Sequence, residues 1–278
     1  MWILREPSPN FRQEYAIDEQ ILTCVSTHSL EIFKSSDFEQ VALIDKKDLL
    51  LKKYLFVHSE LLGHIGICTL PLDSAFTPQT QNPNPIKPLR VLIYDSFNIE
   101  IAFEALKHSD VCVDFVQEDT KCLDSLIDFF EHFSLTRQNP RFRLFEKIID
   151  LDIAKYDVII SDSKLDAHKI DGLSRMLSER GILLYANKHP MLDIEGFKEG
   201  IAQARDFFEV ILPFFPSVSI LNDKSYVFAS RKYHPTSDMV LAKIDFLDGL
   251  KYYNASVHKQ VFALPNFIDS ALKSVAKF

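Results

Sequence analysis

Short apolar runs alternate with helix-like patterns from residue 91 to residue 230, and this alternation constrains the fold more than any other feature. The run VII at 158–160 is apolar throughout, as expected of a strand in a parallel sheet that helices cover on both faces. Alternation at this rhythm predicts an α/β fold with a doubly wound, mostly parallel sheet. The predicted strands are 91–94, 111–116, 158–160, 182–186, 210–212 and 226–230. The predicted helices are 99–108, 120–133, 171–180 and 195–208, with Gly181 as the C-terminal cap of the third.

The first 90 residues follow a different pattern. The runs LEIF at 30–33 and VALI at 41–44 predict short strands of a small antiparallel β domain. Apolar residues then recur at helical spacing, which predicts a helix over 54–67. The stretch 71–88 is rich in Pro, Gln and Asn, a composition typical of a linker. We therefore divide the chain into an N-terminal β domain with its following helix, residues 1–75, and a larger α/β domain, residues 76–278.

Charge and composition exclude several functional classes. The formal net charge of −8 argues against a nucleic-acid binder, because phosphate contacts require clustered Lys and Arg. No apolar run reaches the roughly 20 residues that span a bilayer, and the first residues lack the order of a signal peptide, so we expect a cytoplasmic protein without membrane partners. The four cysteines are scattered, which indicates neither a metal site nor a disulfide framework.

Glycine usage narrows the function further. The chain has seven glycines, and none lies between Gly66 and Gly172. The glycine-rich loops that bind dinucleotides or nucleoside triphosphates are therefore absent. This argues against an NAD enzyme of the ordinary kind and against a nucleoside triphosphatase.

Acids and amides follow the predicted parallel strands, whose carboxyl ends meet at the ligand-binding edge of such a sheet. They are Asp95 and Asn98 after the first strand, Gln117, Glu118 and Asp119 after the second, and Asp162 and Asp166 after the third. One interpretation is a site for a cationic substrate, with Asp162 as a proton acceptor. The other is ordinary capping of the helices that follow. If the edge is a site, it suits transfer from a sulfonium donor to an amine, because the sulfonium is already a good leaving group and the amine needs only a base.

The C-terminal sequence KYYNASVHKQVFALPNFIDSA, residues 251–271, closely resembles the C-terminal signature of the spermidine synthases. Segments at 38–64, 91–94, 156–163 and 228–235 agree with that family in order and spacing. The resemblance covers nearly the whole chain. It implies a methyltransferase-like (Rossmann-like) catalytic domain behind a small N-terminal β domain that takes part in a homodimer.

The resemblance also implies a reaction and its residues. The expected reaction is aminopropyl transfer from decarboxylated S-adenosylmethionine to putrescine, giving spermidine and methylthioadenosine, with no cofactor and no metal. Asp162 corresponds to the family's proton acceptor. The residues expected to bind the amine are Asp166, Glu60 and His58, and those expected to bind the donor are Gln117, Asp119, Asp95, Asn98 and Glu146.

The sequence departs from the family pattern within the expected site. The family's glycine loop is replaced by DSFNIE, residues 95–100, and the aromatic residues of its polyamine channel are replaced by Ser219 and Lys224. The chain thus resembles a divergent bacterial branch of the family. Two alternatives remain open: a relative that has lost catalysis and serves as a binding or scaffold protein, and a transferase that acts on another amine.

Overall fold

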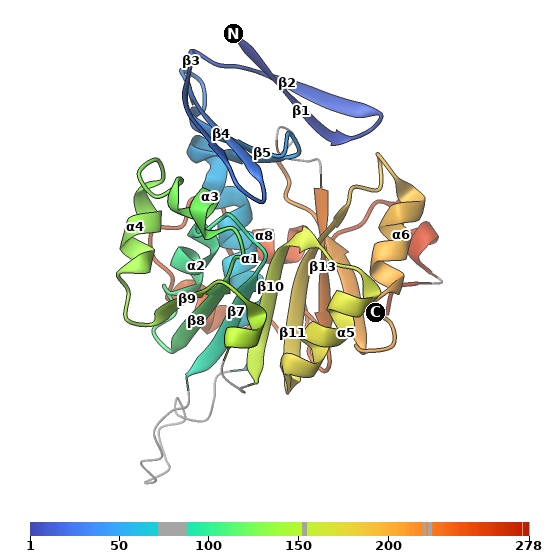
Figure 1. The fold of residues 1–278 in the computed structure, drawn as a ribbon. Coiled ribbons are helices and arrows are strands. Elements are labelled where there is room, and N and C mark those ends of the chain that lie inside the picture. The colour runs from blue at the N-terminus through green and yellow to red at the C-terminus, as the bar shows by residue number, and fades with distance from the viewer. Residues whose placement is uncertain (72–87, 152–154, 219–220, 222–223, 274, 278) are drawn as a thin grey trace.

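The computed structural model describes residues 1–71, 88–151, 155–218, 221, 224–273 and 275–277 (Figure 1). Within these residues, a seven-stranded sheet carries helices on both faces, and two small antiparallel sheets from the N-terminus lie above it. The predicted fold, a mostly parallel α/β sheet with a small N-terminal antiparallel domain, is confirmed. The predicted linker, and with it the division at residue 75, falls almost wholly on residues 72–87, which lie outside the described residues.

The large sheet has the strand order β12-β13-β11-β10-β7-β8-β9. From β7 the chain moves outward to β8 and β9 and then returns to place β10 on the other side of β7, so the direction of winding switches between β7 and β10. Strands β7 to β11 run parallel to one another, whereas β13 runs antiparallel between β11 and β12. The strands are β7 (Leu89–Tyr94), β8 (Val111–Val116), β9 (Phe142–Phe145), β10 (Tyr156–Lys164), β11 (Leu177–Lys188), β12 (Val210–Phe214) and β13 (Lys224–Ser230).

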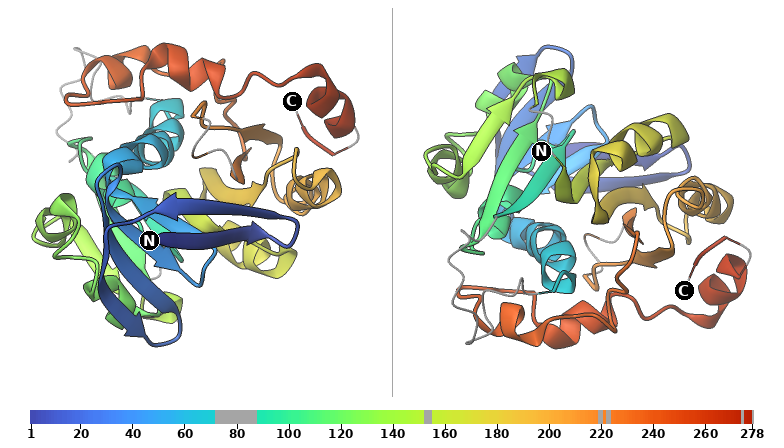
Figure 2. Two further views of the ribbon diagram at one scale, coloured as in Figure 1. Left: turned by 90° about the horizontal axis from the view of Figure 1, so that it is seen from above. Right: turned by 90° about the horizontal axis from the view of Figure 1, so that it is seen from below.

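Alternate residues of the central strand face opposite layers of core. Val158 and Ile160 join the core that contains α1 (Leu55–Thr69), whereas Ile159 joins the core that contains α5 (Ala167–Met176) and α6 (Ile194–Ala202). Figure 2 shows α1 and α8 on one side of the sheet and α5 on the other. No helix in the described part of the chain has the length and apolar character needed to cross a bilayer. The remaining helices are α2 (Glu100–Ala105), α3 (Thr120–Asp124), α4 (Glu131–Arg137), α7 (Leu241–Asp245), α8 (Ala255–Gln260), α9 (Asn266–Leu272) and the 3₁₀ turns Lys52–Tyr54 and Ile148–Asp150.

The N-terminal domain consists of a two-stranded and a four-stranded sheet. Strands β1 (Trp2–Ser8) and β2 (Phe11–Ala16) form a hairpin, and β3 (Glu19–Val25), β4 (Ser29–Ser35), β5 (Glu39–Ile44) and β6 (Asp48–Leu51) form an antiparallel meander. The strands predicted at 30–33 and 41–44 are therefore confirmed. Val57 of α1 and Leu221 complete the apolar core of this domain, so the large domain supplies part of the packing.

The prediction of one amphipathic helix over 120–133 was wrong. The chain forms α3, a run of turns and then α4, because Phe130 adopts an extended backbone with φ −122° and ψ 112°. The apolar stripe was nevertheless a correct guide to burial, since Leu123, Leu126, Phe130 and Phe133 are all in the core. Apolar residues at helical spacing can therefore be buried without a continuous helix, because packing against the core sets their positions.

The helix predicted over 171–180 begins and ends four residues earlier in the structure. Helix α5 spans Ala167–Met176, with the Asp166 side chain capping its N-terminus, and β11 begins at the next residue. Gly181 therefore lies inside β11 and is not a helix cap. A side chain at Gly181 would clash with Leu177, because an added Cβ atom would lie 2.6 Å from the Leu177 Cβ atom. Helix α6 also ends at Ala202, six residues before the predicted end.

Helix α1 confirms the helix predicted over 54–67 and packs closely against α2. Gly63 permits this approach: a Cβ atom there would lie 2.8 Å from the Cβ atom of Glu104 and 3.2 Å from the backbone nitrogen of Ala105. Backbone atoms cannot move aside as a flexible side chain can. Glycine is therefore required at this position by helix packing.

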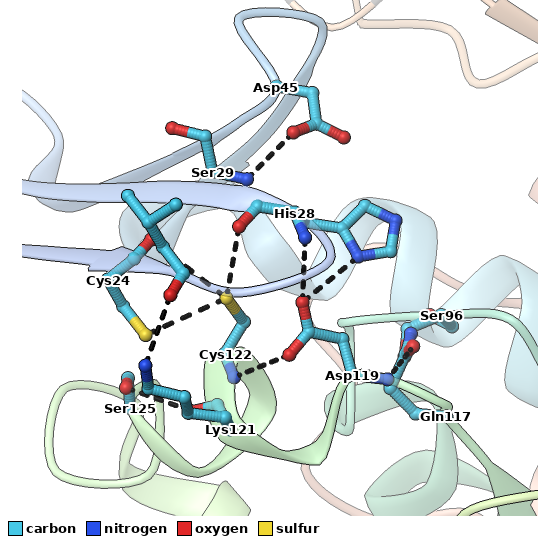
Figure 3. A network of polar contacts seen from close by, with 11 residues as sticks. Cys24, His28, Ser29, Asp45, Ser96, Gln117, Asp119, Lys121, Cys122 and Ser125 are labelled. Carbon is cyan, nitrogen blue, oxygen red and sulfur yellow. Dashed lines mark hydrogen bonds and ion pairs between the residues drawn. The ribbon is translucent and has the colours of Figure 1, made fainter.

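A buried carboxylate joins the two domains (Figure 3). Asp119, directly before α3, accepts a hydrogen bond from the backbone nitrogen of His28 at 2.8 Å, and its side chain has no exposed surface. The other carboxylate oxygen accepts from the backbone nitrogen of Cys122 at 3.1 Å. Burial alone would raise the pKa of Asp119, but the hydrogen bonds from Cys122 and His28 outweigh it and lower the pKa to about 2. Asp119 therefore stays ionised and fixes the β3–β4 turn to the sheet edge.

We expect glycine-to-alanine substitutions at two positions to have opposite effects. Gly63→Ala should destabilise the protein by about 1–3 kcal/mol, because α1 and α2 must separate. Gly172→Ala, on the exposed face of α5 with nothing within 4 Å, should stabilise it by about 0.5–1 kcal/mol. Urea unfolding of both variants measures the difference, and an equal effect at the two sites would contradict this account of the helix contact.

We expect Asp119→Asn to weaken the domain contact and its pH dependence. A carboxylate whose pKa is lowered by folding stabilises the protein above its unfolded-state pKa, about 4, and this contribution is lost as the pH falls toward 2. The variant should lose about 1–2 kcal/mol at pH 7. Its stability should then fall less steeply than that of the wild type between pH 4 and pH 2. Urea titrations across this range test the prediction, with Asp124→Asn, a half-exposed carboxylate at the end of α3, as the matched control.

Candidate active site

The candidate site lies at the carboxyl edge of the large sheet, beside the switch between β7 and β10. Ser161 of β10 pairs with Tyr94 on β7 and with Tyr185 on β11, and the next residue, Asp162, leaves this regular register. Ligands of open α/β sheets bind beyond the strand ends at such a switch point. The sheet topology therefore places Asp162 where a substrate is expected.

The Asp162 carboxylate is the centre of a small polar network. The Tyr226 hydroxyl donates to its Oδ1 atom at 3.0 Å, and the Lys224 Nζ atom lies 2.7 Å from the same oxygen. The His58 Nδ1 atom is 2.9 Å from the Tyr226 oxygen, a distance that suits donation from His58 to Tyr226 when Tyr226 donates to Asp162. Only 14% of the Asp162 side chain is exposed. The network therefore holds one carboxylate in a fixed orientation with limited access to water.

The pocket beside Asp162 is built by both domains. The large domain contributes Asp162 from β10, Asn98 from the loop after β7, and Lys224 from β13, and helix α1 contributes His58. The N-terminal domain and the segment leading to α1 cover the pocket with side chains that are mostly apolar. These residues are Arg5, Tyr15, Leu49, Leu50, Leu51, Tyr54 and Leu55. The pocket beside Asp162 therefore lies between the N-terminal strands and the edge of the large sheet.

Three carboxylates lie near the Tyr94 hydroxyl at the end of β7. Burial, followed by the negative charges of Asp95, Glu118 and Asp166, raises the pKa of the Tyr94 hydroxyl. Asp166 is exposed and accepts a hydrogen bond from the backbone nitrogen of Lys169 as the N-cap of α5. The structure thus brings together three of the predicted edge acids, which make this part of the rim favourable for a cation.

The loop after β7 is held by side-chain amides. The Asn98 Nδ2 atom donates to the Ser59 hydroxyl at 3.0 Å, and the Gln117 Nε2 atom donates to the carbonyl oxygen of Ser96 at 3.1 Å. Asp95 has φ 55°, the left-handed conformation that glycine adopts most easily and that Asp tolerates better than most residues. Asn98 and Gln117 are buried, and their hydrogen bonds support the loop.

Glu60 lies away from this pocket. Its two carboxylate oxygens accept hydrogen bonds from the backbone nitrogens of Lys251, Tyr252 and Tyr253 at 2.7 to 2.8 Å, and only 1% of the residue is exposed. Glu60 therefore anchors the C-terminal motif to α1, and it does not line the pocket beside Asp162.

Two of the predicted donor residues are placed differently from the pocket residues. Asp119 is buried in the domain contact described above, and its backbone nitrogen donates to the Gln117 Oε1 atom at 3.0 Å. Glu146 is exposed in the bend that follows β9. Their roles in donor binding stay predictions. Ser219, expected from the resemblance to replace a channel aromatic, lies outside the described residues.

Sequence reasoning missed Tyr226 and Arg5 as parts of the site. Tyr226 looked like an ordinary strand residue in an apolar run, and Arg5 lies more than 150 residues before Asp162. The signal that was present is the tyrosine hydroxyl within a buried strand, because such a group requires a hydrogen-bond partner. Lys224 had been noticed only as a replacement for an aromatic residue.

Comparisons with known proteins agree with this architecture. The sequence model of the spermine/spermidine synthase domain matches residues 55–240. The polyamine aminopropyltransferase of Helicobacter pylori strain G27 is 40% identical over 279 residues, with 100% of both chains covered.

Solved structures show the same fold. Spermidine synthase from Thermotoga maritima superposes with a TM-score of 0.84 at 23% identity, covering 98% of this chain and 94% of that chain. A spermidine synthase in complex with the transition-state analogue AdoDATO superposes with a TM-score of 0.85, at the same identity and coverage. On the strength of the domain match and the full-length relative, the chain belongs to the spermine/spermidine synthase family.

Proposed function

We propose that this protein transfers the aminopropyl group of decarboxylated S-adenosylmethionine to putrescine, giving spermidine and methylthioadenosine. The family match and the name of the Helicobacter pylori relative support aminopropyl transfer. The single observation in this chain that carries the proposal is the position of Asp162. It is a shielded carboxylate at the topological switch point, in a pocket roofed by the N-terminal domain.

The reaction requires a neutral amine, whereas a free alkylamine has a pKa of about 10. Asp162 accepts the proton that the acceptor nitrogen gives up. As that nitrogen forms its bond to the propyl carbon, the bond from this carbon to sulfur breaks, and its electron pair neutralises the sulfonium. Tyr226 and His58 keep the Asp162 carboxylate oriented toward the pocket. The protein then contributes mainly positioning and proton acceptance.

The donor carries positive charge on its sulfonium and on its amine. Asp95, with Glu118 and Asp166 beside it, supplies the negative charge that such a donor needs at the end of β7. Gln117, Asp119 and Asn98 support the loops around this donor site, and Glu146 lies farther along the same edge at the end of β9. Asp166 and His58 remain the proposed contacts of the acceptor amine. No cofactor or metal enters the proposed reaction, because the sulfonium donor brings its own leaving group.

We also propose a cytoplasmic homodimer. Four large apolar residues of the N-terminal domain are exposed, namely Met1, Trp2, Ile21 and Val25, with 41% to 68% of their surface accessible. Apolar side chains gathered on one small domain support an interface between copies of the chain. The four cysteines are free thiols, as is usual for proteins of the reducing cytoplasm.

We expect Asp162→Asn to fold normally and to lose turnover, with kcat falling by about 100-fold or more because the proton acceptor is gone. Purified enzyme is incubated with decarboxylated S-adenosylmethionine and putrescine, and methylthioadenosine and spermidine are measured by mass spectrometry. Asp171→Asn, a carboxylate on α5 that pairs with Arg175, is the matched control and should retain activity.

The outcomes of this experiment separate the alternatives. Normal turnover of a folded Asp162→Asn variant would remove this carboxylate from the mechanism. A wild-type protein that binds methylthioadenosine in a thermal-shift assay but forms no spermidine would indicate a different amine acceptor. A folded wild-type protein that binds neither decarboxylated S-adenosylmethionine nor putrescine would indicate the scaffold alternative.

A further inference from the structure

The Lys224 ammonium occupies a position that has the features of an amine-binding site. Its Nζ atom lies 2.7 Å from the Asp162 Oδ1 atom, 3.4 Å from the Asp162 carbonyl oxygen, and 5.7 Å from the centre of the Tyr226 ring. A carboxylate, a carbonyl oxygen and an aromatic face are the groups that recognise a protonated amine. The side chain of Lys224 is only 17% exposed. The chain thus fills, with its own ammonium, a site suited to an amine.

This position conflicts with the arrival of an acceptor. The proposed reaction needs the acceptor nitrogen next to the Asp162 carboxylate, where Lys224 and Tyr226 already share one oxygen. Two ammonium groups at one carboxylate repel each other strongly when both are shielded from water. The acceptor and Lys224 therefore compete for Asp162.

The positive charges around the pocket further weaken the binding of a cationic acceptor. Lys224 and Asp162 line two adjoining pockets, and the other charged residues lining them are Arg5, Lys47, Asp48 and Lys164. With Lys224 in place, positive side chains outnumber carboxylates by four to two, which disfavours a doubly charged diamine more than a singly charged amine. Asp48, at the start of β6, is the second carboxylate of the group and is exposed.

We propose that Lys224 is a specificity-determining residue, an internal cation that occupies the acceptor-amine site of the free enzyme and must be displaced by the acceptor. The proposal rests on the proposed aminopropyl transfer. Lys224 thereby sets the affinity for the acceptor, while the chemical step itself is left to Asp162. An amine binds only if its own contacts outweigh the ion pair between Lys224 and Asp162.

The test compares Lys224→Met with Lys224→Arg, which keeps the charge, and with Lys188→Met. Lys188 pairs directly with Lys224 across β11 and β13 but forms its ion pair with Asp193, which makes it a matched control. KM and kcat for putrescine are measured at saturating donor. The Kd for putrescine and for butylamine is measured by calorimetry in the presence of methylthioadenosine.

For Lys224→Met we expect KM and Kd for putrescine to fall by about tenfold, and kcat to change by less than about threefold. The Kd for butylamine should fall less, because a single charge is repelled less than two. Lys224→Arg and Lys188→Met should stay near the wild-type values. A merely structural role for Lys224 would lower thermal stability without this selective gain for the diamine.

An unchanged or raised Kd for putrescine in folded Lys224→Met overturns the proposal, as does an equal gain for both amines. If the Met variant does not fold, Lys224→Gln, which keeps a polar side chain, is measured in its place. The calorimetric result does not depend on turnover. If Lys224→Met binds putrescine more tightly but no spermidine forms, the proposed reaction is rejected and the role of Lys224 is kept. If spermidine forms but the Kd is unchanged, the reaction is kept and the role of Lys224 is rejected.

Discussion

Strand β10 is hydrogen-bonded on both edges, to β7 and to β11, and this double pairing fixes the candidate site. Backbone groups in a buried sheet must all be paired, so a central strand cannot shift without losing bonds on two sides. The regular pairing on both edges ends at Ser161, and Asp162 emerges at the next residue. The Asp162 carboxylate is therefore placed by the register of three strands and does not depend on a flexible loop.

The rest of the pocket depends on how the two domains pack. Arg5 and Tyr15 come from the N-terminal hairpin, His58 from α1, and Tyr226 from a strand near the other end of the chain. Buried contacts hold these parts together: Asp119 binds the His28 backbone, and Leu221 completes the core of the N-terminal domain. A pocket built this way is sensitive to any change that loosens the domain contact, even one far from Asp162.

The loop after β7 keeps its shape without any glycine. Asp95 takes the left-handed backbone conformation, and Asn98 and Gln117 supply hydrogen bonds to the loop that follows. The carboxylate of Asp95 remains partly exposed at the rim, beside Glu118 and Asp166. Polar side chains thus hold a loop that contains no glycine, and the edge beside it is acidic.

The amino-acid sequence by itself determined the layer architecture, because the period of apolar residues reports which faces are buried and the alternation of strand and helix admits few topologies. It also singled out Asp162, since a charged residue two positions after a fully apolar run is expected at the edge of the sheet. Local patterns gave wrong secondary structure where tertiary packing sets the backbone conformation. Examples are the turns between α3 and α4, predicted as helix, and Gly181, predicted as a helix cap but found within β11.

Only the tertiary structure decided which polar residues meet. The sequence placed Glu60 and Asp162 in one site, as an amine ligand and as the proton acceptor. In the structure Glu60 accepts hydrogen bonds from three backbone N–H groups of the C-terminal motif, whereas Asp162 lines the pocket. Tyr226 and Lys224 reach Asp162 across more than 60 residues of sequence. Hydrogen bonds and ion pairs form between atoms about 3 Å apart, and sequence periodicity carries no information about distances between remote segments.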